Sequence, residues 1–175
     1  YKSARIDFVK LKLDHPLYIM FSSGTTGKPK CIVHSAGGVL LKHLVEVGLH
    51  SNAGEKKKFF YFTTCGWMMW NWLVSSLMLN STICLYDGSP FYPNSDILWT
   101  YAEEEKFNFF GTSAKYIDAL SKFKNNISEK FELENLETIG STGSPLVHES
   151  FDYVYNNIKK DVHLASLSGG TDTVS

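Results

Sequence analysis

Short apolar stretches alternate with longer amphipathic ones along the whole chain. Six short stretches are rich in aromatic and branched side chains and are bounded by glycine or polar residues, which predicts strands at 17–21, 58–63, 82–86, 108–111, 136–140 and 162–167. The longer stretches predict helices at 35–48, 69–80, 95–106, 114–123 and 147–158. Strands that alternate with helices at this spacing predict an α/β fold with a parallel sheet wound by helices.

The clearest helix signal lies in the last of these segments, where apolar residues recur on one helical face. They are Val147, Phe151, Val154, Tyr155 and Ile158. The segment 95–106 follows the same pattern, and Ser95 or Asn94 is expected to cap its start. The charged stretch 122–134 predicts a helix end followed by a solvated loop.

Segments rich in glycine, serine and threonine follow five of the predicted strands, at 22–30, 63–67, 111–113, 140–145 and 168–172. Ligands of parallel α/β sheets bind at the carboxyl ends of the strands, so these segments are expected to share one rim. The sequence therefore predicts a single binding cleft at that rim.

Size, charge and cysteine content narrow the choice of partners. A chain of 175 residues suffices for about one domain with a sizeable core. A net charge of −1 gives no electrostatic case for nucleic acid or a membrane surface, and no apolar run approaches the roughly 20 residues of a membrane span.

Cys31, Cys65 and Cys84 lack metal-binding spacing. We expect reduced, mostly buried thiols and, with no signal-peptide pattern, a cytoplasmic protein.

The run Ser22–Lys30, Ser-Ser-Gly-Thr-Thr-Gly-Lys-Pro-Lys, combines the residue types that a polyphosphate requires. Glycines let successive N–H groups point into one concavity, hydroxyls add neutral donors, and lysine adds a full charge. One lysine–phosphate contact has a Coulomb energy of roughly 4 kcal/mol at about 4 Å and an effective dielectric near 20, against about 0.3–1 kcal/mol for a helix dipole. The run is neither a Walker motif nor a GxGxxG motif. The alternative interpretation of the run is a basic turn on the surface. Nine residues of these types in this order make that alternative a poor explanation.

This run resembles the signature loop of the acyl-adenylate-forming (AMP-binding) enzymes, which include acyl-CoA synthetases, luciferases and peptide-synthetase adenylation domains. In that family the loop holds the β- and γ-phosphates of ATP while a carboxylate attacks the α-phosphate. The resemblance implies that ATP is bound by Ser22, Ser23, Gly24, Thr25, Thr26, Gly27 and Lys30. It also implies catalytic roles for Lys30, Thr26 and Thr171.

A segment near residue 143 resembles a second family motif. Gly143, Ser144 and Pro145 match a Gly-Glu-Pro segment whose backbone lies against the adenine and the acyl pocket. Ser144 stands where glutamate is common, so no carboxylate role is carried over. Considered alone, the segment would be a plain strand-to-helix turn.

The run from Ser168 to Asp172 resembles a third motif, a segment ending in Thr-Glu. The resemblance implies nucleotide contacts for Gly169, Gly170 and Thr171, and magnesium binding by Asp172. One carboxylate with phosphate oxygens and water is a common Mg²⁺ environment. By itself, the aspartate would be taken for a helix cap.

Cys65-Gly66-Trp67 resembles the Gly-Trp segment of the acetyl-CoA synthetase branch, where the tryptophan borders the acyl group. We therefore expect Trp67 in the substrate pocket, and Trp70 and Trp72 in the core. His34 is expected to support the phosphate loop rather than act as a base. The other histidines are expected to be surface or packing residues.

The residues before Thr171 bear on the choice of acid. Acetyl-specific relatives carry bulky tryptophans there, whereas this chain has Ser168 and Gly169, which implies a longer and more polar acid. The combination looks most like the acetoacetyl-CoA synthetases, and implies acetoacetate or a similar short acid, ATP, Mg²⁺ and CoA as ligands. The alternatives are another short-chain acyl-CoA synthetase, of the acetate or propionate type, and a non-catalytic nucleotide-binding module.

Relatives continue past the Thr-Glu segment with an aspartate for the ribose, a hinge, and a C-terminal domain that carries the adenylation lysine. Residues 1–175 therefore resemble the central part of an N-terminal domain, without the C-terminal domain. We expect this piece to be inactive alone and to bind nucleotide weakly at most.

Overall fold

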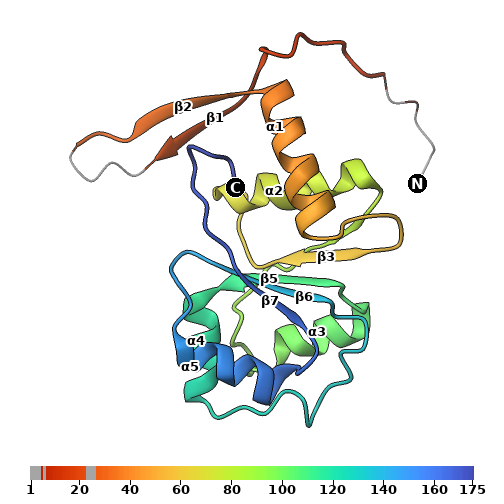
Figure 1. Cartoon of the computed structure of the whole chain (residues 1–175), viewed down its shortest axis with the longest axis vertical. Coiled ribbons are helices and arrows are strands. Elements are labelled where there is room, and N and C mark those ends of the chain that lie inside the picture. Colours follow the sequence, from red (N-terminus) through yellow and green to blue (C-terminus); the bar gives the residue numbers. More distant parts are fainter. Residues whose placement is uncertain (1–4, 6, 23–26) are drawn as a thin grey trace.

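A five-stranded parallel sheet lies at the centre of the molecule (Figure 1). The structure is a computed structural model, which describes residues 5, 7–22 and 27–175. The strand order is β4-β3-β5-β6-β7. The bounds are β3 Lys58–Tyr61, β4 Thr82–Cys84, β5 Phe109–Ser113, β6 Thr138–Thr142 and β7 His163–Ser166. All four neighbouring pairs run parallel.

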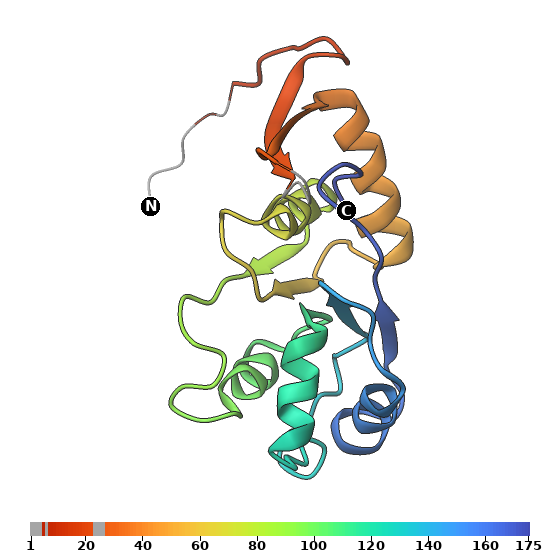
Figure 2. The ribbon, with the colours of Figure 1, turned by 90° about the vertical axis from the view of Figure 1, so that its left-hand side faces the viewer.

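Helices cover both faces of this sheet (Figures 1 and 2). On one face lie α1 (Ala36–His43), its helical continuation η1 (Leu44–His50), α2 (Met68–Ser75) and its continuation η2 (Ser76–Leu79). On the other face lie α3 (Ile97–Glu105), α4 (Ala114–Lys122), α5 (His148–Tyr153) and its continuation η3 (Val154–Ile158). The predicted fold class, a parallel sheet wound by helices, is confirmed. No helix in the described ranges is both long and apolar enough to cross a membrane.

Aromatic residues on alternate positions of β3 and β5 form the two cores. Phe59 stacks on Phe109 with ring centroids 5.0 Å apart, on the side of α1 and α2. Phe60 and Phe110 face the opposite layer, where Trp99 stacks on Phe110 at 4.5 Å. A parallel sheet covered on both faces requires such continuous apolar strands. The packed centre holds the strand ends, and the loops that follow them, in fixed positions.

The first predicted strand does not join this sheet, which corrects the expected topology. β1 (Pro16–Ser22) pairs antiparallel with β2 (Lys30–Ser35), and Ile19 lies opposite Val33. No element was predicted for residues 30–35. The glycine-rich run therefore comes between two antiparallel strands in the chain, and does not follow a strand of the parallel sheet. This two-stranded unit, here called the hairpin, projects beside α1 in Figure 1.

Two local predictions also need correction. Asp96, instead of Ser95 or Asn94, occupies the N-cap position of helix α3, without a side-chain capping hydrogen bond. The Asn94 side chain accepts a hydrogen bond from the Asp96 backbone N–H at 3.0 Å. The stretch 122–134 is only partly solvated, because Asn125 and Ile127 are buried. Ile127 and Leu133 pack into the core shared by α3, α4 and α5, so two apolar residues fix a loop whose charged neighbours suggest a solvated segment.

The three cysteines are free, but their expected burial is wrong for two of them. Cys31 is exposed on β2, and Cys65 is exposed in the loop after β3. Only Cys84, on β4, is buried. Burial raises the pKa of its thiol to about 11. Cys31 is exposed because its strand, β2, lies outside the buried sheet.

Candidate functional site

A large cleft of about 1070 Å³ lies between the hairpin and the carboxyl ends of the sheet strands. Its walls come from β1 and from the segments that follow β3, β6 and β7. The lining residues are 17–21, 65–69, 71, 142–145, 166–171 and 175. Segments far apart in the sequence therefore meet in one cavity. Three of the five predicted rim segments contribute described residues to it.

Trp67 lies on the wall of this cleft, directly before α2, and 69% of its surface is exposed. Trp72 is only 3% exposed and packs against Phe59 and Tyr61, as expected for a core residue. Trp70 is half-buried, so it does not belong to the core as predicted. One turn of helix thus separates a solvent-accessible indole from a packed one.

The segment after β6 is held in place by a buried tyrosine. The Tyr61 hydroxyl lies 2.7 Å from Thr142 Oγ1. Burial raises the pKa of Tyr61 to about 12, against the opposing effect of the Thr142 hydrogen bond, so the phenol stays neutral. Gly143 follows with φ +85°, a backbone conformation that glycine adopts without strain. Gly143, Ser144 and Pro145 are thereby turned outward along the cleft and are exposed.

The predicted rim segment 111–113 does not line the cleft, which is a further correction. A Cβ at Gly111 would overlap the Tyr61 ring, with Cε2 and Cγ of that ring at 2.5 Å. Thr112 is buried, and the Ser113 hydroxyl accepts a hydrogen bond from the backbone N–H of Tyr116 at 3.2 Å. These residues are therefore explained by packing and by the N-cap of α4.

The segment after β7 folds into a tight turn at its end. The backbone N–H and the hydroxyl of Thr173 both donate to the Gly170 carbonyl at 3.1 Å. A Cβ at Gly169 would overlap the Ser175 carbonyl, so the absence of a side chain there has a local packing reason as well as the predicted one. Ser168, Gly169, Gly170 and Thr171 line the cleft.

The phosphate-loop prediction falls partly outside the described residues, because Ser23, Gly24, Thr25 and Thr26 are not described. Ser22 ends β1 opposite Lys30, which begins β2. Lys30 is exposed and is not among the described residues that line the cleft. Gly27 is exposed with φ +152°. The predicted roles of these residues stay predictions.

The cleft wall formed by β1 was missed by the sequence analysis. Tyr18, Met20 and Ser22 are half-buried, while Ile19 and Phe21 between them are exposed, the alternation of a strand with one covered face. This alternation is visible in the sequence only once β2 is recognised as the partner of β1. Tyr18 and Met20 then lie on the side of the hairpin that faces the molecule.

Asp172 is the predicted magnesium ligand, and its surroundings suit an ion that arrives with a nucleotide. Its carboxylate is exposed and forms no ion pair with a described residue. Within the described part of the chain, no three His, Cys, Asp or Glu residues gather as a metal cluster. One free carboxylate fits Mg²⁺ that takes its other ligands from phosphate and water. It does not fit a metal held by protein ligands alone.

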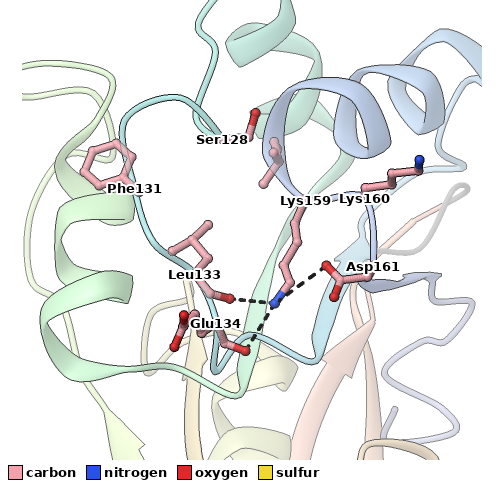
Figure 3. Close-up of a pocket in the computed structure, with 8 residues that line it drawn as sticks. Ser128, Phe131, Leu133, Glu134, Lys159, Lys160 and Asp161 are labelled. Carbon is pink, nitrogen blue, oxygen red and sulfur yellow. Dashed lines mark hydrogen bonds and ion pairs between the residues drawn. The ribbon is translucent and has the colours of Figure 1, made fainter.

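A second, smaller pocket of about 410 Å³ lies on the far side of the sheet, near the end of η3 (Figure 3). The Lys159 amine in it donates to the carbonyl oxygens of Leu133 at 2.7 Å and Glu134 at 3.2 Å, and lies 4.0 Å from Asp161. These contacts tie the loop before β6 to the end of η3. The amine is therefore already engaged by the protein.

Comparison with known proteins shows the family to which the chain belongs. A family model described as AMP-binding enzyme matches residues 2–173. An acetoacetyl-coenzyme A synthetase of Rhizobium meliloti (strain 1021) is 56% identical over 175 residues, which are 100% of this chain and 27% of that protein. An acetoacetyl-CoA synthetase of Danio rerio is 48% identical over 171 residues, 98% of this chain and 25% of that protein. The solved acetoacetyl-CoA synthetase from Streptomyces lividans has a TM-score of 0.92 and 42% identity, and the match covers 99% of this chain and 27% of that one.

These similarities extend over almost the whole chain, although the chain spans only about a quarter of the length of the relatives. They confirm the resemblance stated from the run Ser22–Lys30. They also agree with the more specific resemblance to acetoacetyl-CoA synthetases. The chain belongs to the AMP-binding enzyme family.

Proposed function

We propose that this chain forms the nucleotide- and acid-binding part of a longer ATP-dependent acid–CoA ligase. In this proposal residues 1–175 are the central part of the N-terminal domain. The enzyme converts acetoacetate, ATP and CoA to acetoacetyl-CoA, AMP and pyrophosphate through an acyl-adenylate. The observation that carries the proposal is the meeting of the segments 65–69, 142–145 and 166–171 with β1 in one cleft.

The proposed roles at the phosphate end follow the order of the chain. Ser22, Ser23, Gly24, Thr25, Thr26 and Gly27 cradle the β- and γ-phosphates through backbone N–H groups and hydroxyls. Lys30 neutralises charge on the leaving pyrophosphate, and Thr171 donates to a phosphate oxygen. Asp172 holds the Mg²⁺ that accompanies ATP, and the ion supplies further charge neutralisation when bound. Catalysis then consists of positioning and electrostatic stabilisation, without a side-chain base.

The proposed roles at the other end concern the adenosine and the acid. Gly143, Ser144, Pro145, Gly169 and Gly170 contact the adenosine. At the three glycines the backbone can approach a flat base without a side chain in the way. Trp67 borders the acyl group. Ser168 donates its hydroxyl hydrogen to the keto oxygen of acetoacetate. The exposed edge of Trp67 in the cleft supports this arrangement.

Acid-dependent exchange of pyrophosphate into ATP tests the proposed reaction, with the complete polypeptide that contains this chain. We expect exchange with acetoacetate to exceed exchange with acetate and propionate. The substitution Lys30→Ala is expected to lower it roughly ten- to hundredfold, the usual contribution of a charged hydrogen bond. Lys115→Ala is the matched control, because Lys115 is exposed on α4, away from the cleft. Nucleotide binding without acid-dependent exchange would instead support a non-catalytic module.

The choice of acid is tested at Ser168, because a side chain at Gly169 would overlap the Ser175 carbonyl. Ser168→Trp is expected to reduce exchange with acetoacetate and to favour acetate. Ser168→Thr keeps the hydroxyl and serves as the control. An unchanged acid preference in Ser168→Trp would remove Ser168 from the acid pocket.

A further inference from the structure

Two histidines from the beginning of the chain bind the turn at its end. His34 lies on β2, opposite Tyr18 and four residues after Lys30. Its Nε2 donates to the backbone carbonyl of Thr171 at 2.7 Å. This contact joins the returning strand of the hairpin to the turn that carries Thr171 and Asp172.

His43 binds the same turn from a second side. It lies at the end of α1, is fully buried, and places Nε2 2.7 Å from the Val174 carbonyl and Nδ1 2.6 Å from Ser75 Oγ. A carbonyl only accepts, so Nε2 carries the hydrogen. Burial lowers the pKa of His43, against the opposing Val174 hydrogen bond, which favours the neutral ring with its hydrogen on Nε2.

The two bonds and the buried Val174 side chain attach the turn to the rest of the molecule, because the other described hydrogen bonds of the turn are internal. Thr173 and Ser175 donate back to Gly170, which closes the turn but does not attach it to another element. The His34 bond attaches its first residue to the hairpin, and the His43 bond attaches Val174 to α1. Asp172 lies between the two attachment points and is exposed.

We propose that His34 and His43 are positioning residues, which hold Thr171 and Asp172 in a fixed position relative to β2, the strand that begins at Lys30. The inference rests on the proposed function, in which the loop and Asp172 act on the same triphosphate. Neither imidazole touches the substrate in this arrangement. Each acts through a backbone carbonyl, so each affects the alignment of groups that must converge on one phosphate.

The first test compares His34→Ala with His34→Gln in the complete polypeptide, by acetoacetate-dependent exchange of pyrophosphate into ATP. Glutamine presents an amide N–H near the position of Nε2, so it can keep the bond to Thr171. We expect His34→Ala to lower kcat about tenfold, with KM for acetoacetate unchanged, and His34→Gln to recover most of that loss. His50→Ala is the matched control, because His50 is exposed at the end of η1.

The second test does not depend on activity. Hydrogen exchange of the backbone amides in 168–175 is expected to accelerate in His34→Ala and in His43→Ala, and to stay near the wild-type rate in His34→Gln and His50→Ala. If the wild-type protein lacks pyrophosphate exchange but amide exchange still accelerates in the two alanine variants, only the proposed reaction is contradicted, and the attachment is supported. Unchanged amide exchange in both alanine variants would overturn the inference, as would a kcat of His34→Gln no better than that of His34→Ala.

Discussion

The close approach of Gly111 to the Tyr61 ring leads to a quantitative prediction for Gly111→Ala. The new Cβ would have Cε2 and Cγ of the ring at 2.5 Å and Cδ2 closer still, whereas ordinary van der Waals contact begins near 3.4 Å. The ring would therefore have to move by more than about 1 Å. It is held by Trp72 in an edge contact at 6.0 Å and by the Thr142 hydroxyl at 2.7 Å. The substitution therefore forces apart groups that also fix the start of the 142–145 segment.

The expected loss follows from two contributions. Overpacking of a well-filled core reduces the free energy of unfolding by about 1–3 kcal/mol. A lost Tyr61–Thr142 hydrogen bond adds about 1 kcal/mol. Gly111→Ala should thus lower the free energy of unfolding by about 2–4 kcal/mol in total.

Urea denaturation of four proteins isolates the cause: wild type, Gly111→Ala, Tyr61→Ala and the double variant. Tyr61→Ala removes the ring that the new Cβ would meet, so Gly111→Ala should then lower the free energy of unfolding by less than about 0.5 kcal/mol. Gly54→Ala is the control, since a Cβ there meets no atom within 4 Å. Equal losses for Gly111→Ala with and without the Tyr61 ring would refute the reasoning.

Two further predictions concern titratable groups. Cys31 and Cys65 should react quickly with a thiol reagent in the native protein, and Cys84 only on unfolding, because it is buried with its pKa raised to about 11; three equally fast thiols would contradict this. Burial alone would raise the pKa of Asp96. Hydrogen bonds from Lys130 and Asn125 outweigh that effect and hold the pKa below its ordinary value of 3.8. The stabilisation from Asp96 should therefore be present above pH 3.8 and lost as the pH falls further, so the difference in melting temperature between wild type and Asp96→Asn should shrink in acid.

Local periodicity was sufficient to predict the helices, because their patterns are set by residues close in sequence. The predicted apolar face of 147–158 is only partly correct, since Val147 and Tyr155 are exposed. Periodicity was insufficient for β2, since Lys30–Ser35 shows no alternation of polar and apolar residues and gains its identity from its partner β1. The segment 111–113 shows a different limit. Gly111 is required by a ring 50 residues earlier, and sequence alone cannot separate that need from a ligand's need for exposed backbone. The cleft was predicted through 142–145 and 168–171, where glycine-bearing turns follow sheet strands.

The hydrogen bond between His34 and Thr171 also has a thermodynamic consequence. This bond joins the hairpin to the turn that carries Thr171 and Asp172. A molecule that rigidifies one of them therefore lowers the entropy cost of ordering the other. By thermodynamic linkage this effect is mutual. A cation bound at Asp172 would raise the affinity of the hairpin for an anion, and the anion would raise the affinity for the cation by the same factor. Cooperative binding of the cation and the anion would then follow from a contact that exists before either of them binds.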